Sequence, residues 1–264
     1  MNRTKRPLDF HEASEVISMA MKNVIYHKTS GSTVVPFHCN LAPAYGKLNE
    51  KGAIKSMDEQ LKIIIAGTTR SMTKLIEERK GKDIEWSQIV EVMSQNPLLE
   101  PCDDVTERSD KYIKHSSGAF KFDGSPDETI VKEVEAWFHK LISDEDVLKD
   151  TKIHIDVYAK IVAESGARIQ DFVTLFYKHS THEEKIMDIG VLRYPDIDHP
   201  FFKVYRIQLT AWSTCERFLF EQKDTHGITG SFTCRKYKPR ASVLEKISEK
   251  VKQKAVEEAE AMFD

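Results

Sequence analysis

Cysteine is scarce in this sequence, and the spacing of its cysteines excludes several classes of protein. Only 4 cysteines occur in 264 residues, and no two of them form a C-x-x-C pair. Disulfide-rich secreted scaffolds, zinc ribbons and thioredoxin-like redox motifs all require more cysteines or closer pairs. We therefore expect free thiols in a reducing compartment, inside the cell, in the cytoplasm or the nucleus.

Long apolar runs are also missing. The longest compact run covers residues 63–66, whereas a membrane-spanning helix needs about 20 apolar residues. The basic segment at residues 1–7 is not followed by the apolar core of a secretory signal, and the sequence has no myristoylation glycine after Met1 and no prenylation cysteine. We expect a soluble protein without a transmembrane segment.

Neither sign of charge is in large excess. Lysine and arginine number 39 and aspartate and glutamate 42, which gives a formal net charge of −3. A chain this close to neutrality is not a polyelectrolyte, so any contact with nucleic acid or anionic lipid must come from a local patch.

The short motifs of common enzymes are absent as well. We find no P-loop, no Gly-rich dinucleotide fingerprint, no nucleophile elbow and no H-E-x-x-H. We predict no cofactor and lean against an enzyme. Because active sites also assemble from residues far apart in the chain, the question of catalysis stays open at this stage.

Helical periodicity dominates the first half of the chain. Apolar residues recur there at a period of 3.6, and N-cap residues or capping boxes mark where segments begin. A short strand is predicted at residues 32–39, where Pro36 favours an edge position. The predicted helices cover residues 9–26, 56–80, 83–95 and 125–141.

A polar stretch rich in turn residues separates the two halves. It covers residues 98–124, and we predict a loop there. The predicted organisation is a mainly helical region at 1–98, a polar connecting loop at 99–124 and a third region at 125–264. The first and third regions could form one continuous domain.

Beyond residue 150 the apolar pattern changes to a period of two, which indicates strands. We also predict a loop at residues 179–185, a hairpin turn at 224–227 and an amphipathic helix from residue 242. The predicted strands cover residues 152–162, 168–177, 186–194, 202–222 and 228–237.

Together these elements predict an α+β fold. It has a helix-rich N-terminal half and a five-stranded antiparallel meander in the C-terminal half, because short connections favour antiparallel neighbours. A C-terminal amphipathic helix closes the fold by covering an apolar face.

The densest positive charge lies where the last predicted strand meets the C-terminal helix. Such a patch could bind the phosphates of a nucleic acid, with Tyr237 stacking on a base, or dock on anionic lipid. A solvated strand end and helix face would have the same composition. The residues of this predicted basic patch are Arg235, Lys236, Tyr237, Lys238, Arg240, Lys246 and Lys250.

Histidines and aspartates in two predicted loops are weak candidates for metal ligands. A zinc site needs three or four convergent ligands, and the sequence shows two nearby histidines without showing convergence. A solvated polar loop explains them equally well, so we predict no metal. The candidates are His179, His182, Asp196, Asp198 and His199.

Three functions follow from these patterns. We favour a non-enzymatic binding or assembly protein, scaffold-, matrix- or coat-like, that self-associates or contacts a protein or anionic partner through the basic patch. The second is a carrier of an apolar ligand between a curved sheet and the C-terminal helix. The third is a metal-dependent hydrolase that uses the loop containing His179 and His182.

Overall fold

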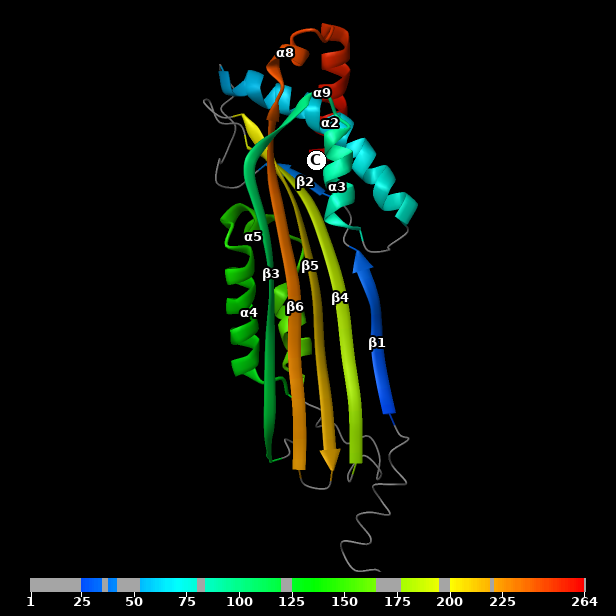
Figure 1. The fold of residues 1–264 in the computed structure, drawn as a ribbon, viewed down its shortest axis with the longest axis vertical. Coiled ribbons are helices and arrows are strands. Elements are labelled where there is room, and N and C mark those ends of the chain that lie inside the picture. The colour runs from blue at the N-terminus through cyan, green and yellow to red at the C-terminus, as the bar shows by residue number, and fades with distance from the viewer. Residues whose placement is uncertain are drawn as a thin grey trace, which may run out of the picture.

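The computed structural model shows an α+β protein built on one six-stranded sheet (Figure 1). It describes residues 25–34, 38–41, 53–79, 84–119, 125–164, 177–194, 200–218 and 221–263. Most of the helix predicted at 9–26 and most of the strand predicted at 168–177 lie outside these residues.

Four long strands form the antiparallel part of the sheet, in the spatial order β4-β5-β6-β3. Two further strands, β1 and β2, pair with β4 in parallel, one after the other along its outer edge. The sheet therefore has β3 at one edge and β1 with β2 at the other. The strands are β1 (Ile25–Val34), β2 (His38–Leu41), β3 (Leu99–Ala119), β4 (Tyr177–Tyr194), β5 (Phe201–Phe218) and β6 (Glu221–Pro239).

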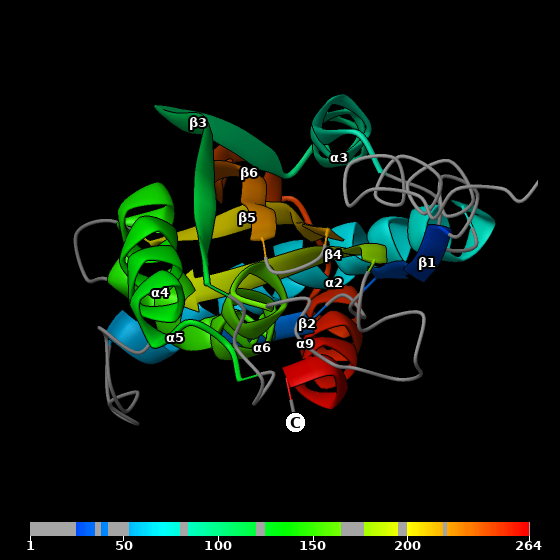
Figure 2. The ribbon, with the colours of Figure 1, turned by 90° about the horizontal axis from the view of Figure 1, so that it is seen from below.

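Helices pack on both faces of this sheet, as Figure 2 shows. One face carries α4, α5 and α6, and the other carries α2 and α3, with α9 packed against α2. The helices are α2 (Ala53–Arg79), α3 (Trp86–Ser94), α4 (Glu128–Ile142), α5 (Glu145–Asp150), α6 (Ile155–Val162), α8 (Ala241–Leu244) and α9 (Glu249–Phe263).

Strand β4 connects the two cores. Ile186 and Leu192 belong to the core under α4 and α6, whereas Met187, Ile189 and Val191 belong to the core under α2 and α3. Successive side chains of a strand point to opposite faces. Because both faces are covered here, this part of β4 is apolar at nearly every position.

Three predicted helices are present with small shifts in their ends. The helix predicted at 56–80 is α2, and those predicted at 83–95 and 125–141 are α3 and α4. The N-cap of α4 is Asp127, because the Asp127 carboxylate accepts a hydrogen bond of 2.9 Å from the Thr129 amide. Among the described residues, no helix is long and apolar enough to cross a membrane.

The strand predicted at 152–162 is wrong, because residues 155–162 form helix α6. The alternation of isoleucine, valine and alanine hides a helical pattern. Tyr158, Ala159 and Val162 are buried against the sheet, whereas Val157 is 47% exposed. Both periods are present in this sequence, and packing on the sheet selects the helix.

The loop predicted at 98–124 is also wrong over most of its length, because β3 occupies Leu99–Ala119. The side chains of β3 are mostly exposed or half-buried, so its sequence lacks an apolar alternation. Backbone pairing with β6 runs along almost the whole strand, whereas few of its side chains are buried.

Two further predicted loops are parts of strands. Residues 179–185 lie within β4, and the predicted turn at 224–227 lies within β6, whose pairing with β5 begins at Glu221. The predicted five-stranded meander is therefore replaced by four antiparallel strands, of which β3 comes from the first half of the chain.

Candidate functional site

The predicted basic patch lies at one end of β6, where acidic side chains of β3 offset its charge. The ammonium of Lys236 is 2.7 Å from the Asp104 carboxylate, and that of Lys238 is 3.2 Å from the Glu100 carboxylate. The hydrogen bond from Lys236 lowers the pKa of Asp104. The paired strands therefore present an ion-pair network here.

Tyr237 is not placed to stack on a base. Its side chain is buried at 3% exposure and stacks on Phe202, with ring centroids 5.7 Å apart. Arg235 lies over the same ring. The remaining residues of the patch, Arg240, Lys246 and Lys250, are exposed around α8 and at the start of α9.

The two predicted metal ligands that lie in the described residues do not converge. His179 and His182 lie on β4 three positions apart, so their side chains point to opposite faces of the sheet. The His182 ring is occupied by two carboxylates, Glu164 at 2.5 Å and Glu184 at 3.3 Å. Within the described ranges no group of three or more such ligands is suited to a metal ion. Asp196, Asp198 and His199 lie outside those ranges.

A buried cluster that the sequence did not reveal lies between the sheet and α5. His38 of β2 has its Nε2 atom 2.9 Å from Asp150 Oδ2 and its Nδ1 atom 3.4 Å from Asp188 Oδ1. Tyr205 of β5 donates a hydrogen bond of 2.7 Å to Asp150, to which Asn40 also donates. The side chains of Asp150 and Asp188 are 3% and 0% exposed.

Burial and pairing with charged neighbours have opposite effects on the pKa values in this cluster. Burial lowers the pKa of His38, but its hydrogen bond with Asp150 and the charge of Asp188 outweigh this and raise it. Burial raises the pKa of Asp150, but hydrogen bonds from His38, Tyr205 and Asn40 bring it below its usual value. Burial dominates for Asp188, whose pKa is raised. An imidazolium beside the ionised Asp150 is the favoured state.

The geometry of this cluster suits a structural role better than a catalytic one. Thr151 donates to Asp188 at 2.5 Å, and the Lys152 amide donates at 3.0 Å, so the hydroxyl of Thr151 is not directed at the imidazole. The cluster joins β2, β4 and β5 to the end of α5. The sequence signal was Asp188 inside an apolar run, because a buried charge requires a partner.

A second buried polar row lies where β5 and β6 leave their hairpin. Cys215 is directly opposite Asp224, and His226 follows on the same face. The His226 Nδ1 atom donates to the Val162 carbonyl, and Nε2 accepts from Ser116 at 3.2 Å. Burial lowers the pKa of His226. Both ring nitrogens are occupied, so this histidine is not placed to activate the Cys215 thiol.

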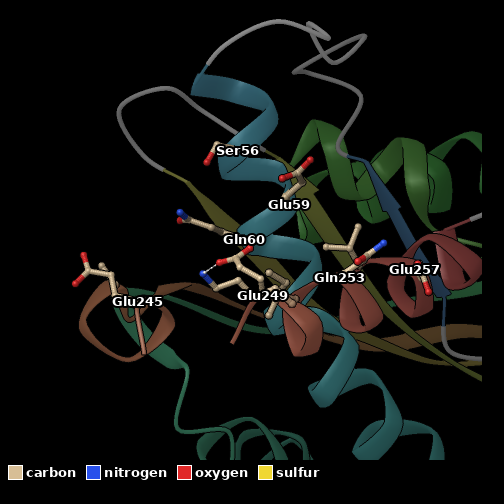
Figure 3. Close-up of a pocket in the computed structure, with 11 residues that line it drawn as sticks. Ser56, Glu59, Gln60, Glu245, Glu249, Gln253 and Glu257 are labelled. Atoms are coloured by element: carbon tan, nitrogen blue, oxygen red, sulfur yellow. Dashed lines mark hydrogen bonds and ion pairs between the residues drawn. The ribbon is translucent and has the colours of Figure 1, made fainter. Parts of the chain in front are cut away.

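A groove of about 630 Å³ lies between α2 and α9 (Figure 3). Its walls carry many carboxylates and amides, and Lys252 pairs with Glu249 at 2.7 Å. A carrier of apolar ligands needs a mostly apolar, enclosed cavity, so this groove does not fit that function. The lining residues labelled in Figure 3 are Ser56, Glu59, Gln60, Glu245, Glu249, Gln253 and Glu257.

One face of the sheet changes from apolar to polar along the length of its strands. Near Phe202 and Val204 this face packs under α2 and α3. Further along the same strands it carries polar side chains around a shallow depression of about 580 Å³. No helix of the described residues lies over this polar part, and we call it the uncovered face. Figure 1 looks onto it. The side chains that define it are Ser109, Lys111, Gln208, Thr210, Trp212, Thr229 and Ser231.

Trp212 lies at the end of this face, where a glycine leaves space for its ring. Gly227 lies directly opposite Trp212, and a Cβ atom on it would come within 2.3 Å of the indole ring. The indole therefore packs against the β6 backbone at Gly227, while remaining partly exposed. This arrangement places an aromatic side chain on the uncovered face among short hydroxyl and amide side chains.

Comparison with known proteins identifies no family. No family model matches the chain, and no curated protein matches it. A solved structure, "Structure of the Evf virulence factor", aligns over 90% of this chain and 79% of its own chain, with 8% sequence identity and a TM-score of 0.25. A similarity this low supports no inference about fold or activity.

Proposed function

We propose that this chain is a non-enzymatic, intracellular binding or assembly protein that contacts a protein partner through the uncovered face. The observation that carries the proposal is the face itself. It is built on four long hydrogen-bonded strands, whose opposite side is fixed by the core under α4 and α6. A rigid surface loses little conformational entropy when it binds.

The chemistry of the uncovered face favours a protein partner. Trp212 supplies the kind of aromatic anchor that carries much of the energy in protein interfaces. Threonine, serine and glutamine around it offer both donors and acceptors. Lys111 and Lys185 lie on this face with Glu107 and Glu183, so neither sign of charge dominates.

Site-specific photo-crosslinking tests this proposal. A photoreactive amino acid at Thr210, in the centre of the face, should give one discrete crosslinked species in cells. The matched control places it at Lys140, exposed on α4 on the opposite side. The pattern at Thr210 should disappear when Trp212 is changed to Ala. The same crosslinked species at both sites, or no crosslinked species at Thr210, would count against the proposal.

A second candidate is an anionic partner, either nucleic acid or lipid, at the basic residues that β3 does not neutralise. Arg240, Lys246 and Lys250 are exposed around α8 and α9. Binding of single-stranded RNA or phosphatidylserine vesicles should then weaken as salt rises. The variant K246E/K250E should abolish it, and a variant that binds as tightly as the wild type would exclude this candidate.

A further inference from the structure

Strand β3 is one edge of the sheet, and no other strand of the described residues pairs with its second side, which we call the free side. It pairs with β6 over almost its whole length and is the last strand in the spatial order (Figure 1). An edge strand presents unpaired backbone groups that can add another strand. The Lys111 amide donates to the Asp110 carboxylate at 2.8 Å. This contact indicates that the odd-numbered residues direct their backbone groups to the free side.

Two exposed apolar side chains lie on this edge strand. Val105 is 47% exposed and Ile113 is 45% exposed, and they are among the four large apolar side chains that are exposed in the described residues. Both are odd-numbered, so they lie on the face of the sheet that carries Ser109 and Lys111. Edge strands usually avoid such side chains, since they invite pairing with another chain.

Charge along β3 is distributed unevenly. The first half is acidic, with Asp103, Asp104 and Glu107, and the second half carries Lys111 and Lys114. A strand with this distribution is complementary to itself when a second copy runs in the opposite direction.

We propose that two copies of this chain pair through β3, antiparallel, about a two-fold axis at Ser109. Glu107 then lies opposite Lys111 of the second copy, and Val105 lies opposite Ile113 of the second copy. Arg108 lies opposite Asp110 of the second copy. Each contact occurs twice because the interface is symmetric.

The charges select this register over its neighbours. Moving the axis by one residue places Arg108 against Arg108, or Asp110 against Asp110. Moving it by two places Glu107 against Glu107, or Lys111 against Lys111. Like charges directly opposite each other destabilise a strand pair. Of these five registers, only the one centred on Ser109 opposes every charge between residues 105 and 113 with the other sign.

Helix α4 contacts β3 through Arg108, Tyr112 and Lys114, on the face of the sheet opposite to Ser109 and Lys111. Its Trp137 and Leu141 reach over β6 to Gly230, which shows that its buried side faces inward from the edge. On its exposed side a shallow depression of about 320 Å³ lies around the small residue Ala136, next to Glu133. Glu133 binds Tyr112 and Lys114 of β3, so this depression lies beside the edge strand.

The dimer joins the two sheets into one and doubles the width of the uncovered face. It does not depend on the proposed protein partner, because its contacts lie on β3 alone. One strand pair buries a small area compared with stable interfaces, so we expect dimerisation that depends on protein concentration.

Disulfide crosslinking tests the register. The variant Ser109→Cys places two thiols opposite each other, with Cα atoms about 5.5 Å apart, a distance that a disulfide spans. The control Lys111→Cys places its two thiols about 14 Å apart along the strands. Under mild oxidation Ser109→Cys should form a covalent dimer and Lys111→Cys should not. Equal crosslinking of both, or none of Ser109→Cys beyond the wild type, would overturn the proposal.

Charge exchange gives an independent test by sedimentation equilibrium. Glu107→Lys should weaken dimerisation at least about tenfold, a change equivalent to 1.4 kcal/mol. The double variant Glu107→Lys/Lys111→Glu should restore it, because each pair regains opposite charges. The control Lys160→Glu, on the exposed side of α6, should change nothing. A wild type that stays monomeric at high concentration, or a double variant no better than Glu107→Lys, would refute the pairing.

Discussion

His38 is held between two carboxylates that have almost no contact with solvent. Its own side chain is 12% exposed, and Tyr205 and Asn40 complete the hydrogen bonding of Asp150. A buried ion pair adds little when it is complete, but removing one partner leaves an uncompensated charge. The cluster is therefore a point at which one substitution has a large effect.

We expect His38→Ala to lower the free energy of unfolding by about 3 kcal/mol, because Asp150 and Asp188 lose their cation. Urea unfolding at pH 6 measures this change. The control is His154→Ala, since His154 is exposed and its side chain makes no cap hydrogen bond. Equal stability of the two variants would show that the cluster does not hold β2 in place.

The same cluster predicts how stability depends on pH. Folding raises the pKa of His38 from 6.5, so its contribution is complete below pH 6.5 and is lost as the pH rises through the folded value. Folding lowers the pKa of Asp150 from 3.8, so its contribution is present above pH 3.8 and is lost as the pH falls through the folded value. The raised pKa of Asp188 acts in the opposite direction, since its ionisation costs stability.

The stability difference between wild type and His38→Gln should accordingly be largest between about pH 4 and 6.5 and should shrink at higher pH. Urea unfolding across this range measures it. A difference that grows as the pH rises above 6.5 would mean that the imidazolium is not the stabilising form.

At the scale of elements, replacing glycine by alanine should have opposite effects on stability at two positions. Gly67 lies within α2, and a Cβ atom there would be 3.8 Å from Asn96, an ordinary contact. We expect Gly67→Ala to raise the stability by about 1 kcal/mol, because alanine favours the helix. A Cβ atom on Gly190 would come within 2.5 Å of the Tyr205 ring, so Gly190→Ala should destabilise by about 2 kcal/mol. Thermal unfolding of the two variants checks both signs.

Helices with a clear 3.6 period could be predicted from the sequence, as α2, α3 and α4 show, although their exact ends could not. Other elements could not, and α6 and β3 show the reasons. In α6 both periods are present, and contact with the sheet decides between them. In β3 neither period is present, because pairing with β6 requires no pattern of buried side chains.

The sites could be predicted only in part, because their members lie far apart in the sequence. The basic residues of β6 were visible in the sequence, but the acidic residues that pair with them lie on β3, more than a hundred positions earlier. The cluster around His38 joins four elements and has no local motif. Only the isolated Asp188 in an apolar run pointed to it.

For the whole molecule, the topology predicts the order of folding. Strands β4, β5 and β6 are joined by short connections, whereas β1 pairs with residues of β4 about 150 positions away. Local pairs form before distant ones because loop closure costs less entropy. Pulse-labelling hydrogen exchange during refolding should protect amides of β5 and β6 before those of β1. Simultaneous protection of all strands would contradict this order.

The position of β3 has a further consequence for newly made chains. Asp110 pairs with Gly230, so 120 residues must be added before the partner of this strand exists. At about 5–20 residues per second, ribosomes need roughly 6–24 s for that stretch. During this interval both sides of β3 are open, and its exposed valine and isoleucine are available to neighbouring nascent chains. Translation speed and chaperone capacity, more than the stability of the finished fold, should therefore govern how much of this protein reaches its native state.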